Sequence, residues 1–149
     1  MAQLIESKQG SFKSFLDVGT GTGILSLVAY HYGAEEICAV DYDEFSMKAA
    51  RVNFQLNKSQ GIILRQADIA NFRPGKHFDF VAANLITFDL IKLKAHLIRL
   101  VDKGGHLAVS GISLDNAAYF RRNFASSKVQ LKKIREGRKW AAFLYQKLS

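Results

Sequence analysis

The feature that most constrains this chain is a glycine-rich stretch at residues 16–25, LDVGTGTGIL. It begins as an apolar strand, turns through three glycines at alternate positions, and continues as the start of a helix. Glycine adopts positive φ readily and lets a ligand approach the backbone, because it has no side chain. In α/β proteins such a turn borders the crevice in which a nucleotide-like ligand binds. The stretch therefore predicts either a cofactor site or a plain turn between a strand and a helix.

The spacing of the glycines excludes two common nucleotide sites. A dinucleotide fingerprint needs G-x-G-x-x-G/A, in which the third small residue lets the helix pack closely. Counted from Gly19, that third position is the large Ile24, and counted from Gly21 it is Ser26, a poor match. A P-loop is excluded because no Gly-Lys-Ser/Thr follows the turn. The remaining pattern, Asp-x-Gly-x-Gly-x-Gly, resembles motif I of the class I S-adenosylmethionine-dependent methyltransferases.

Composition is that of an ordinary globular chain. Its 149 residues can enclose one sizeable core, and 48% are hydrophobic and 23% charged. No run of 18 apolar residues is present, so we expect no membrane span, and the first eight residues lack the pattern of a signal peptide. The single cysteine, Cys38, cannot form an internal disulfide. We therefore expect a cytoplasmic protein in which Cys38 is buried as a small hydrophobe.

The net charge of +8 is unevenly distributed along the chain. Residues 1–120 carry 12 basic and 12 acidic residues, whereas residues 121–149 carry nine basic residues and one acid, Glu136. Such asymmetry fits a nucleic-acid or ribosomal partner, with ribosomal RNA as one candidate, or a solvated basic edge that keeps the protein soluble. Aromatic and basic residues do not alternate here as they do in platforms that bind single strands.

Alternating apolar segments predict an α/β fold with a parallel, doubly wound sheet. We expect strands at residues 13–18, 36–40, 62–67, 78–84 and 106–112, and a closing hairpin of strands at 129–134 and 140–146. Helices are expected at residues 24–32, 44–57, 87–102 and 113–125. Residues 1–149 would form a single domain. Right-handed crossovers would place the carboxyl ends of the parallel strands along one edge.

Local signals predict where two of these helices begin and end. Asp43 is expected to cap the helix at 44–57, and Thr87 the helix at 87–102, which Gly104 and Gly105 would end. The helix at 44–57 has one apolar face at helical spacing, which we expect to be buried. That face consists of Phe45, Ala49, Val52 and Leu56.

Polar features follow four successive strands: the glycine turn, Asp41, Asp68 and Asn84. Asp41 lies 22 residues after Gly19 and is placed to accept hydrogen bonds from ribose hydroxyls. Asp68 is placed to bind an adenine amino group, with the apolar Ile69 beside it to cover the ring. Asn84 offers a donor and an acceptor to the cofactor's amino-acid end or to the incoming nucleophile. Each aspartate alone also fits a local capping role, and Asn84 a local backbone bond, but the four features together predict one binding edge.

Longer segments resemble one family, the PrmA-type methyltransferases, which modify a large-subunit ribosomal protein. The similarity runs in order through residues 17–25, 39–43, 49–53, 56–57, 78–85, 104–107, 110–112 and 140. The segments VAANL at 81–85 and LAVSGI at 107–112 are the most specific. The resemblance implies a Rossmann-like sheet of about seven strands in the order 3-2-1-4-5-7-6, with the last hairpin antiparallel. It also implies S-adenosyl-L-methionine as cofactor and an amino group of a ribosomal protein, on lysine or at the N-terminus, as target.

The resemblance further implies the residues of the site. Gly19, Asp41 and Asn84 match family positions that bind S-adenosylmethionine, and we expect Asn84 also to orient the amine. The expected cofactor contacts are Asp17, Gly19, Thr20, Gly21, Gly23, Asp41, Tyr42, Asp68, Ile69 and Asn84. The chain lacks the family's Gly-Thr-Gly-x-His-Pro-Thr-Thr segment and has no room for its N-terminal substrate-recognition domain, so we expect a catalytic domain alone.

The residues leave the reaction itself open. An amine nucleophile must lose a proton, since a free lysine has a pKa near 10.4, and no general base is evident. The four histidines and one cysteine lack ligand-like spacing, so no metal is expected. Residues 84–87 also lack the Asn-Pro-Pro-Tyr motif of enzymes that methylate planar amides and bases, which argues against glutamine or adenine as the target. Two alternatives remain: an RNA methyltransferase that uses residues 121–149, or a cofactor-binding domain inactive without its substrate module.

Overall fold

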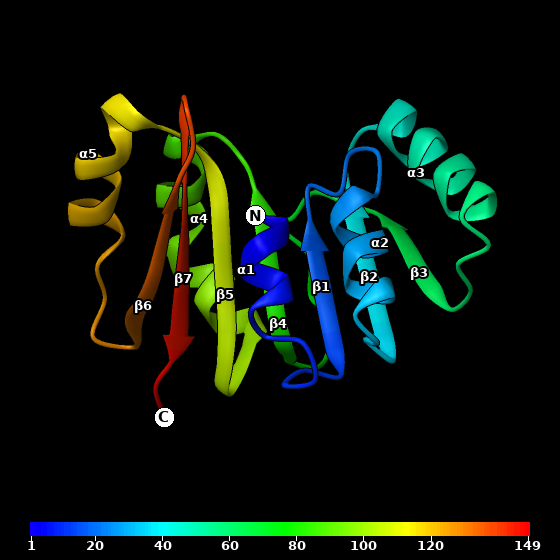
Figure 1. Ribbon diagram of the computed structural model, residues 1–149, viewed down its shortest axis with the longest axis horizontal. Helices are drawn as coiled ribbons and strands as arrows, with labels where there is room; N and C mark the ends of the chain where they lie inside the picture. Colours follow the sequence, from blue (N-terminus) through cyan, green and yellow to red (C-terminus); the bar gives the residue numbers. More distant parts are fainter.

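Side chains alternate between two apolar layers along the central strands of one sheet. The computed structural model describes all 149 residues, from Met1 to Ser149 (Figure 1). The elements are α1 (Ala2–Glu6), β1 (Ser14–Val18), α2 (Ile24–His31), β2 (Glu36–Asp41), α3 (Glu44–Leu56), β3 (Ile62–Gln66), β4 (Phe78–Asn84), α4 (Thr87–Leu100), β5 (Val101–Ser113), α5 (Leu114–Phe124), β6 (Val129–Glu136) and β7 (Trp140–Lys147). No helix is both long and apolar enough to span a membrane.

The strand order is β3-β2-β1-β4-β5-β7-β6, as predicted. Strands β1 to β5 are parallel, whereas β7 is antiparallel to both β5 and β6, so the predicted closing hairpin is confirmed. The order reverses between β1 and β4, the point at which ligands bind in open α/β sheets. The glycine turn follows β1 directly, and Asn84 ends β4 beside it.

The two faces of the sheet are covered by different helices (Figure 1). Residues of α1 and α2 pack with Phe15 and Phe80, and α3 packs with the same side of β2 and β3. Residues of α4 and α5 pack with Leu16 and Val81 on the opposite face. Neighbouring residues of one strand thus serve opposite layers, because successive strand side chains point to opposite faces. Cys38 is buried, as predicted.

The predicted buried face of α3 is wrong. Phe45, Val52 and Leu56 are 80%, 52% and 74% exposed, and the side chains that pack inward are Met47, Ala50 and Phe54. Both sets have helical spacing, so periodicity alone does not distinguish them. The inward face is selected by the tight fit of Phe54 against Gly23 and of Ala50 against the sheet.

The predicted boundary between α4 and β5 is also wrong. The helix ends at Leu100 and β5 begins at Val101, five residues before the predicted His106, so Gly104 and Gly105 lie inside a strand. A Cβ on Gly105 would lie 2.7 Å from the backbone oxygen of Asp79 in β4, so this glycine permits close strand approach. At the other end of α4 the N-cap is Ile86, without a side-chain cap; Thr87 is the first helical residue. The predicted Asp43 cap of α3 is confirmed by a 2.7 Å bond from the Ser46 N–H.

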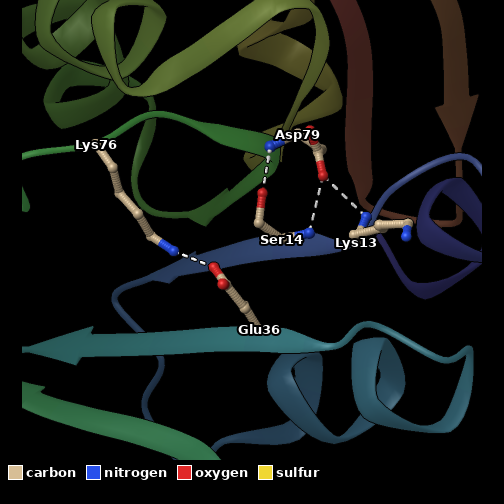
Figure 2. Close-up of polar contacts among 5 residues, drawn as sticks. All are labelled: Lys13, Ser14, Glu36, Lys76 and Asp79. Atoms are coloured by element: carbon tan, nitrogen blue, oxygen red, sulfur yellow. Dashed lines mark hydrogen bonds and ion pairs between the residues drawn. The ribbon is translucent and has the colours of Figure 1, made fainter.

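The sequence patterns did not predict α1 or the polar contacts at the amino ends of the strands. In α1, Leu4 and Ile5 are fully buried. Figure 2 shows Asp79 of β4, whose carboxylate accepts hydrogen bonds from the backbone N–H groups of Lys13 and Ser14, both at 2.9 Å. The Ser14 hydroxyl in turn accepts the Asp79 N–H at 2.9 Å. These contacts join segments 65 residues apart and connect β1 to β4 at their amino ends.

Candidate functional site

The glycine turn after β1 depends on backbone conformations that suit glycine. Gly19, Gly21 and Gly23 have φ of +68°, +53° and +83°, in the left-handed region that other residues rarely adopt. The N–H groups of Gly19 and Thr20 both donate to the carbonyl of Val40, at 2.9 and 3.0 Å, which connects the turn to β2. A Cβ on Gly23 would lie 2.5 Å from the ring of Phe54, so Gly23 serves helix packing rather than ligand contact.

Asp17 supports the turn from inside the protein. It is fully buried, and one carboxylate oxygen accepts hydrogen bonds from the Thr20 hydroxyl at 2.7 Å and from the Ser26 hydroxyl and N–H at 2.8 and 3.0 Å. Burial raises the pKa of Asp17 above its ordinary value, and the bonds from Thr20 and Ser26 oppose that shift. Thr20 is only 5% exposed. Asp17 and Thr20 were expected to contact the cofactor. In the structure both lie behind the turn, and neither lines the cavity described below.

Asp41 connects the turn to the start of α3. One carboxylate oxygen accepts the Gly21 N–H at 2.9 Å, and the other accepts the Asp43 N–H at 3.0 Å. Asp68 does the same for the loop after β3, accepting the Ala70 N–H at 2.9 Å. The capping roles considered for both aspartates are therefore present, and both carboxylates also line a cavity.

This cavity, of about 550 Å³, opens at the carboxyl ends of the strands. It is lined by Gly19, Val40, Asp41, Tyr42, Asp43, Ser46, Ala67, Asp68, Ile69, Ala70, Leu85, Asp89, Lys92 and Leu93. Five of the predicted site residues thus meet around one space: Gly19, Asp41, Tyr42, Asp68 and Ile69. Its volume lies within the range of small-molecule and cofactor sites, about 300–1,000 Å³.

Several lining residues were not predicted. Asp89, Lys92 and Leu93 come from the first half of α4 and face the cavity at helical spacing. Lys92 and Leu93 follow Asp89 by three and four residues, a spacing that places all three on one face of a helix. The sequence shows this spacing, but only the packing of α4 beside β4 shows that this face borders the cavity. Leu85 directly follows the predicted Asn84 and contacts the glycine turn.

The cavity is rich in unpaired negative charge. Four aspartates line it, Asp41, Asp43, Asp68 and Asp89, against one lysine, Lys92. None of the four takes part in an ion pair, since the ion pairs of the protein are Lys13–Glu35, Lys48–Glu44 and Lys76–Glu36. In a chain of net charge +8, this edge is therefore locally acidic, which favours cationic ligands.

Asn84 is the last residue of β4 and is exposed; it does not line the cavity, whereas the adjacent Leu85 does. It is paired in register with Ser110 of β5, and the next residue, Leu85, donates its N–H to the Ser110 carbonyl at 3.1 Å. Gly21 and Gly23, like Asp17 and Thr20, do not line the cavity. The structure thus separates the predicted residues into a cavity wall, an interior support and one exposed amide.

A second cavity of the same volume lies toward the amino ends of β2, β3 and β4, around Cys38 and Arg65. It includes none of the predicted site residues. No three His, Cys, Asp or Glu side chains come together in a group that could hold a metal ion. The carboxyl-edge cavity, at the reversal of strand order, is therefore the candidate functional site.

The fold and the site together place this chain among the class I methyltransferase-like proteins. Residues 2–148 match the family described as ribosomal protein L11 methyltransferase (PrmA), and the chain belongs to this family. It is 33% identical over 132 residues to the ribosomal protein L11 methyltransferase of Pelobacter propionicus, covering 89% of this chain and 42% of that protein. It is 34% identical to that of Geobacter metallireducens, covering 93% and 46%.

Among solved structures, the fold is similar to that of a ribosomal protein L11 methylase from Lactobacillus delbrueckii subsp. bulgaricus. The TM-score is 0.90 at 27% identity, over 99% of this chain and 77% of that one. The chain spans less than half the length of the two curated relatives. The family and the fold are thus established, including the strand order implied by the resemblance.

Proposed function

We propose that this chain binds S-adenosylmethionine in the carboxyl-edge cavity and methylates an amino group of ribosomal protein L11, on lysine or at the N-terminus. In this proposal residues 1–149 form the methyl-transfer domain. The observation that carries it is the cavity beside the glycine turn, where Gly19, Asp41 and Asp68 meet. Membership of the L11 methyltransferase family supports the target.

The residues of the cavity fit this cofactor. Two carboxylates, Asp41 and Asp68, lie on the wall with the apolar Ile69, which suits a ribose, an adenine amino group and a ring face. The aspartates without ion-pair partners favour a ligand that carries positive charge, and the cofactor has a sulfonium and an ammonium group. When bound, the cofactor supplies an activated methyl group that a neutral amine attacks.

Asn84 is the residue that we assign to the amine. Asn84 is exposed and adjoins Leu85 of the cavity wall, and its side-chain oxygen can accept a hydrogen bond from an amine N–H and orient the nitrogen lone pair. Orientation of this kind can supply several kcal/mol of a barrier, up to about 7–11 kcal/mol in the best cases. An amide oxygen takes no proton at neutral pH, so the amine proton passes to solvent before attack.

Methylation of ribosomal RNA receives no support from the relatives, which are described as L11 methyltransferases. Many basic residues after position 120 lie on or near β6, the outer strand of the sheet, where Lys132, Lys133 and Arg135 are placed. Charged side chains on an edge strand prevent pairing with other chains, which accounts for them without a nucleic-acid partner.

The test has two stages. Calorimetry with S-adenosylmethionine asks whether the cavity binds the cofactor, and no heat at millimolar concentration would reject the proposed site. Transfer of labelled methyl groups is then measured to purified ribosomal protein L11 and, in parallel, to protein-free ribosomal RNA. Labelling of L11 is the expected result; labelling of RNA would replace the target, and binding without any transfer would leave a cofactor-binding domain.

A further inference from the structure

Two glycines flank the segment that carries Asn84: Gly19, in the turn after β1, and Gly111, in β5. On the β1 side, a Cβ on Gly19 would lie 2.7 Å from Cδ2 of Leu85, so the leucine side chain occupies the space that Gly19 leaves. On the β5 side, a Cβ on Gly111 would lie 2.2 Å from the carbonyl oxygen of Leu85 and 2.8 Å from its carbonyl carbon. A side chain at 111 is therefore incompatible with the present backbone path.

Gly111 also lies directly against the amide of Asn84. The same Cβ position is 3.3 Å from Oδ1 of Asn84, closer than ordinary van der Waals contact. The strand is irregular here: the pairing of β5 with β7 shifts between Val109 and Ile112, and Gly111 has φ of +89°. Irregularities of this kind change the direction of a strand and are frequent beside active sites.

We propose that Gly111 is a positioning residue for methyl transfer, and that its missing side chain sets where the Asn84 carboxamide lies. This rests on the function proposed above. Gly111 does not line the cofactor cavity, whereas Leu85 and Gly19 do. Its contact with Asn84 lies outside that cavity, so we expect a side chain at position 111 to change the orientation of the amine more than the affinity for S-adenosylmethionine.

The size of the effect follows from the contact distances. Ordinary contacts begin near 3.4 Å, so a methyl group at position 111 displaces the Leu85 carbonyl by about 1 Å, given its 2.2 Å separation. Asn84 directly precedes Leu85 in the chain, so it moves with the Leu85 backbone. A misplacement of about 1 Å at a reacting group typically costs about 10²-fold in rate.

The test compares Gly111→Ala with a matched control, Gly104→Ala. Both glycines lie in β5 with positive φ, +89° and +74°, so both substitutions carry similar backbone strain. A Cβ on Gly104 meets nothing within 4 Å. We expect Gly111→Ala to lower kcat on L11 by about 100-fold, with the Kd for S-adenosylmethionine within about threefold of wild type. Gly104→Ala should leave both near wild type, and equal losses in the two variants would overturn the proposal.

A double substitution shows whether Gly111 acts through Asn84. If it does, Gly111→Ala combined with Asn84→Ala is no slower than Asn84→Ala alone, because the group being positioned is already gone. A purely structural role would slow the double variant further, by the full factor of Gly111→Ala. Multiplying effects would therefore contradict the assignment.

Nuclear magnetic resonance tests the positioning without reference to activity. In the wild-type chain we expect nuclear Overhauser effects between the Asn84 side-chain amide protons and the Gly111 Hα protons, and their absence would overturn the proposal even if Gly111→Ala fails to fold. In folded variants, the Asn84 side-chain amide signals should shift in Gly111→Ala but not in Gly104→Ala. If the wild type transfers no methyl group yet shows these contacts, the proposed function fails and with it the role of Gly111 in methyl transfer, while the placement of the Asn84 carboxamide against Gly111 is confirmed.

Discussion

One cavity lies at the carboxyl ends of the strands, the carboxyl edge, and another lies toward their amino ends, the amino edge. Each has a volume of about 550 Å³, but the carboxylates near them are held in different ways. At the amino edge, Glu36 pairs with Lys76, and Asp79 accepts the N–H groups of Lys13 and Ser14 at the start of β1 (Figure 2). Glu35 also pairs with Lys13. At the carboxyl edge, the carboxylates contact backbone N–H groups close to them in sequence or across the turn, and none has a cation as partner.

This difference separates stability from ligand binding. The bonds of Asp79 connect segments 65 residues apart, so they form only in the folded chain and stabilise it. The charges of Asp41 and Asp68 are not neutralised within the protein, so they remain available to a ligand in the cavity. Substitutions at the carboxyl edge should therefore change binding and turnover, whereas those at the amino edge should change the free energy of unfolding.

The largest effect is expected at Asn84. Asn84→Ala removes the exposed amide at the end of β4 and should lower turnover by about 100-fold, with the Kd for S-adenosylmethionine within about threefold of wild type. Initial rates on L11 and calorimetry measure the two quantities. Asn57→Ala, which removes an exposed amide at the end of α3, is the control and should change neither. Equal losses of turnover and affinity in Asn84→Ala would reject the orienting role.

The next effect is expected at Asp41. Asp41→Asn keeps the size of the side chain and one acceptor but removes a charge from the cavity wall. We expect about tenfold weaker binding of S-adenosylmethionine, equivalent to about 1.4 kcal/mol, measured by calorimetry. Asp102→Asn removes one carboxylate at the start of β5, outside the cavity, and should leave the affinity unchanged. An equal loss in both variants would mean that net charge, and not the cavity, attracts the ligand.

The parts of the molecule that were predicted depend on local pattern. Apolar strands alternating with helices predicted the parallel sheet, and Asp43, directly before the predicted helix, predicted the cap of α3. The strand order came from the resemblance to the family and is confirmed. The strand-end residues Gly19, Asp41 and Asp68 were found together because the carboxyl ends of parallel strands meet at one edge.

The parts that were missed depend on contacts between distant segments. The inward face of α3 is decided by the fit of Phe54 against Gly23, 31 residues earlier in the chain, and not by periodicity. Gly105 was predicted to end a helix, whereas it lies in β5, where a side chain would clash with the backbone oxygen of Asp79 in β4. The contribution of α4 to the cavity likewise required knowing how that helix packs beside β4.

At the amino edge, Asp79→Ala should destabilise the fold without changing the site. It removes two charge-assisted hydrogen bonds at 2.9 Å and should lower the free energy of unfolding by about 1–2 kcal/mol. Denaturant titration measures this, and calorimetry should show an unchanged affinity for S-adenosylmethionine. A loss of affinity larger than the loss of stability would contradict the separation of the two edges.

The same substitution should change the response to acid. Partial burial raises the pKa of Asp79, but the N–H groups of Ser14 and Lys13 outweigh it and hold the pKa below its ordinary value. The stabilisation by Asp79 is therefore complete above the unfolded-state pKa, near 3.9, and is lost as pH falls through the lower folded-state value. Wild type should lose stability over this range relative to Asp79→Ala, and parallel curves for the two proteins would rule this contribution out.

The smallest effect is expected from the exposed ion pair of the same edge. Lys13 and Glu35 are 3.5 Å apart, and their side chains are 78% and 65% exposed. Glu35→Gln should change the free energy of unfolding by less than about 0.5 kcal/mol, because solvent and salt screen such pairs. Denaturant titration beside Asp79→Ala makes the comparison direct. A cost as large as that of Asp79→Ala would mean that ion pairing, rather than hydrogen bonding between strands, stabilises the amino edge.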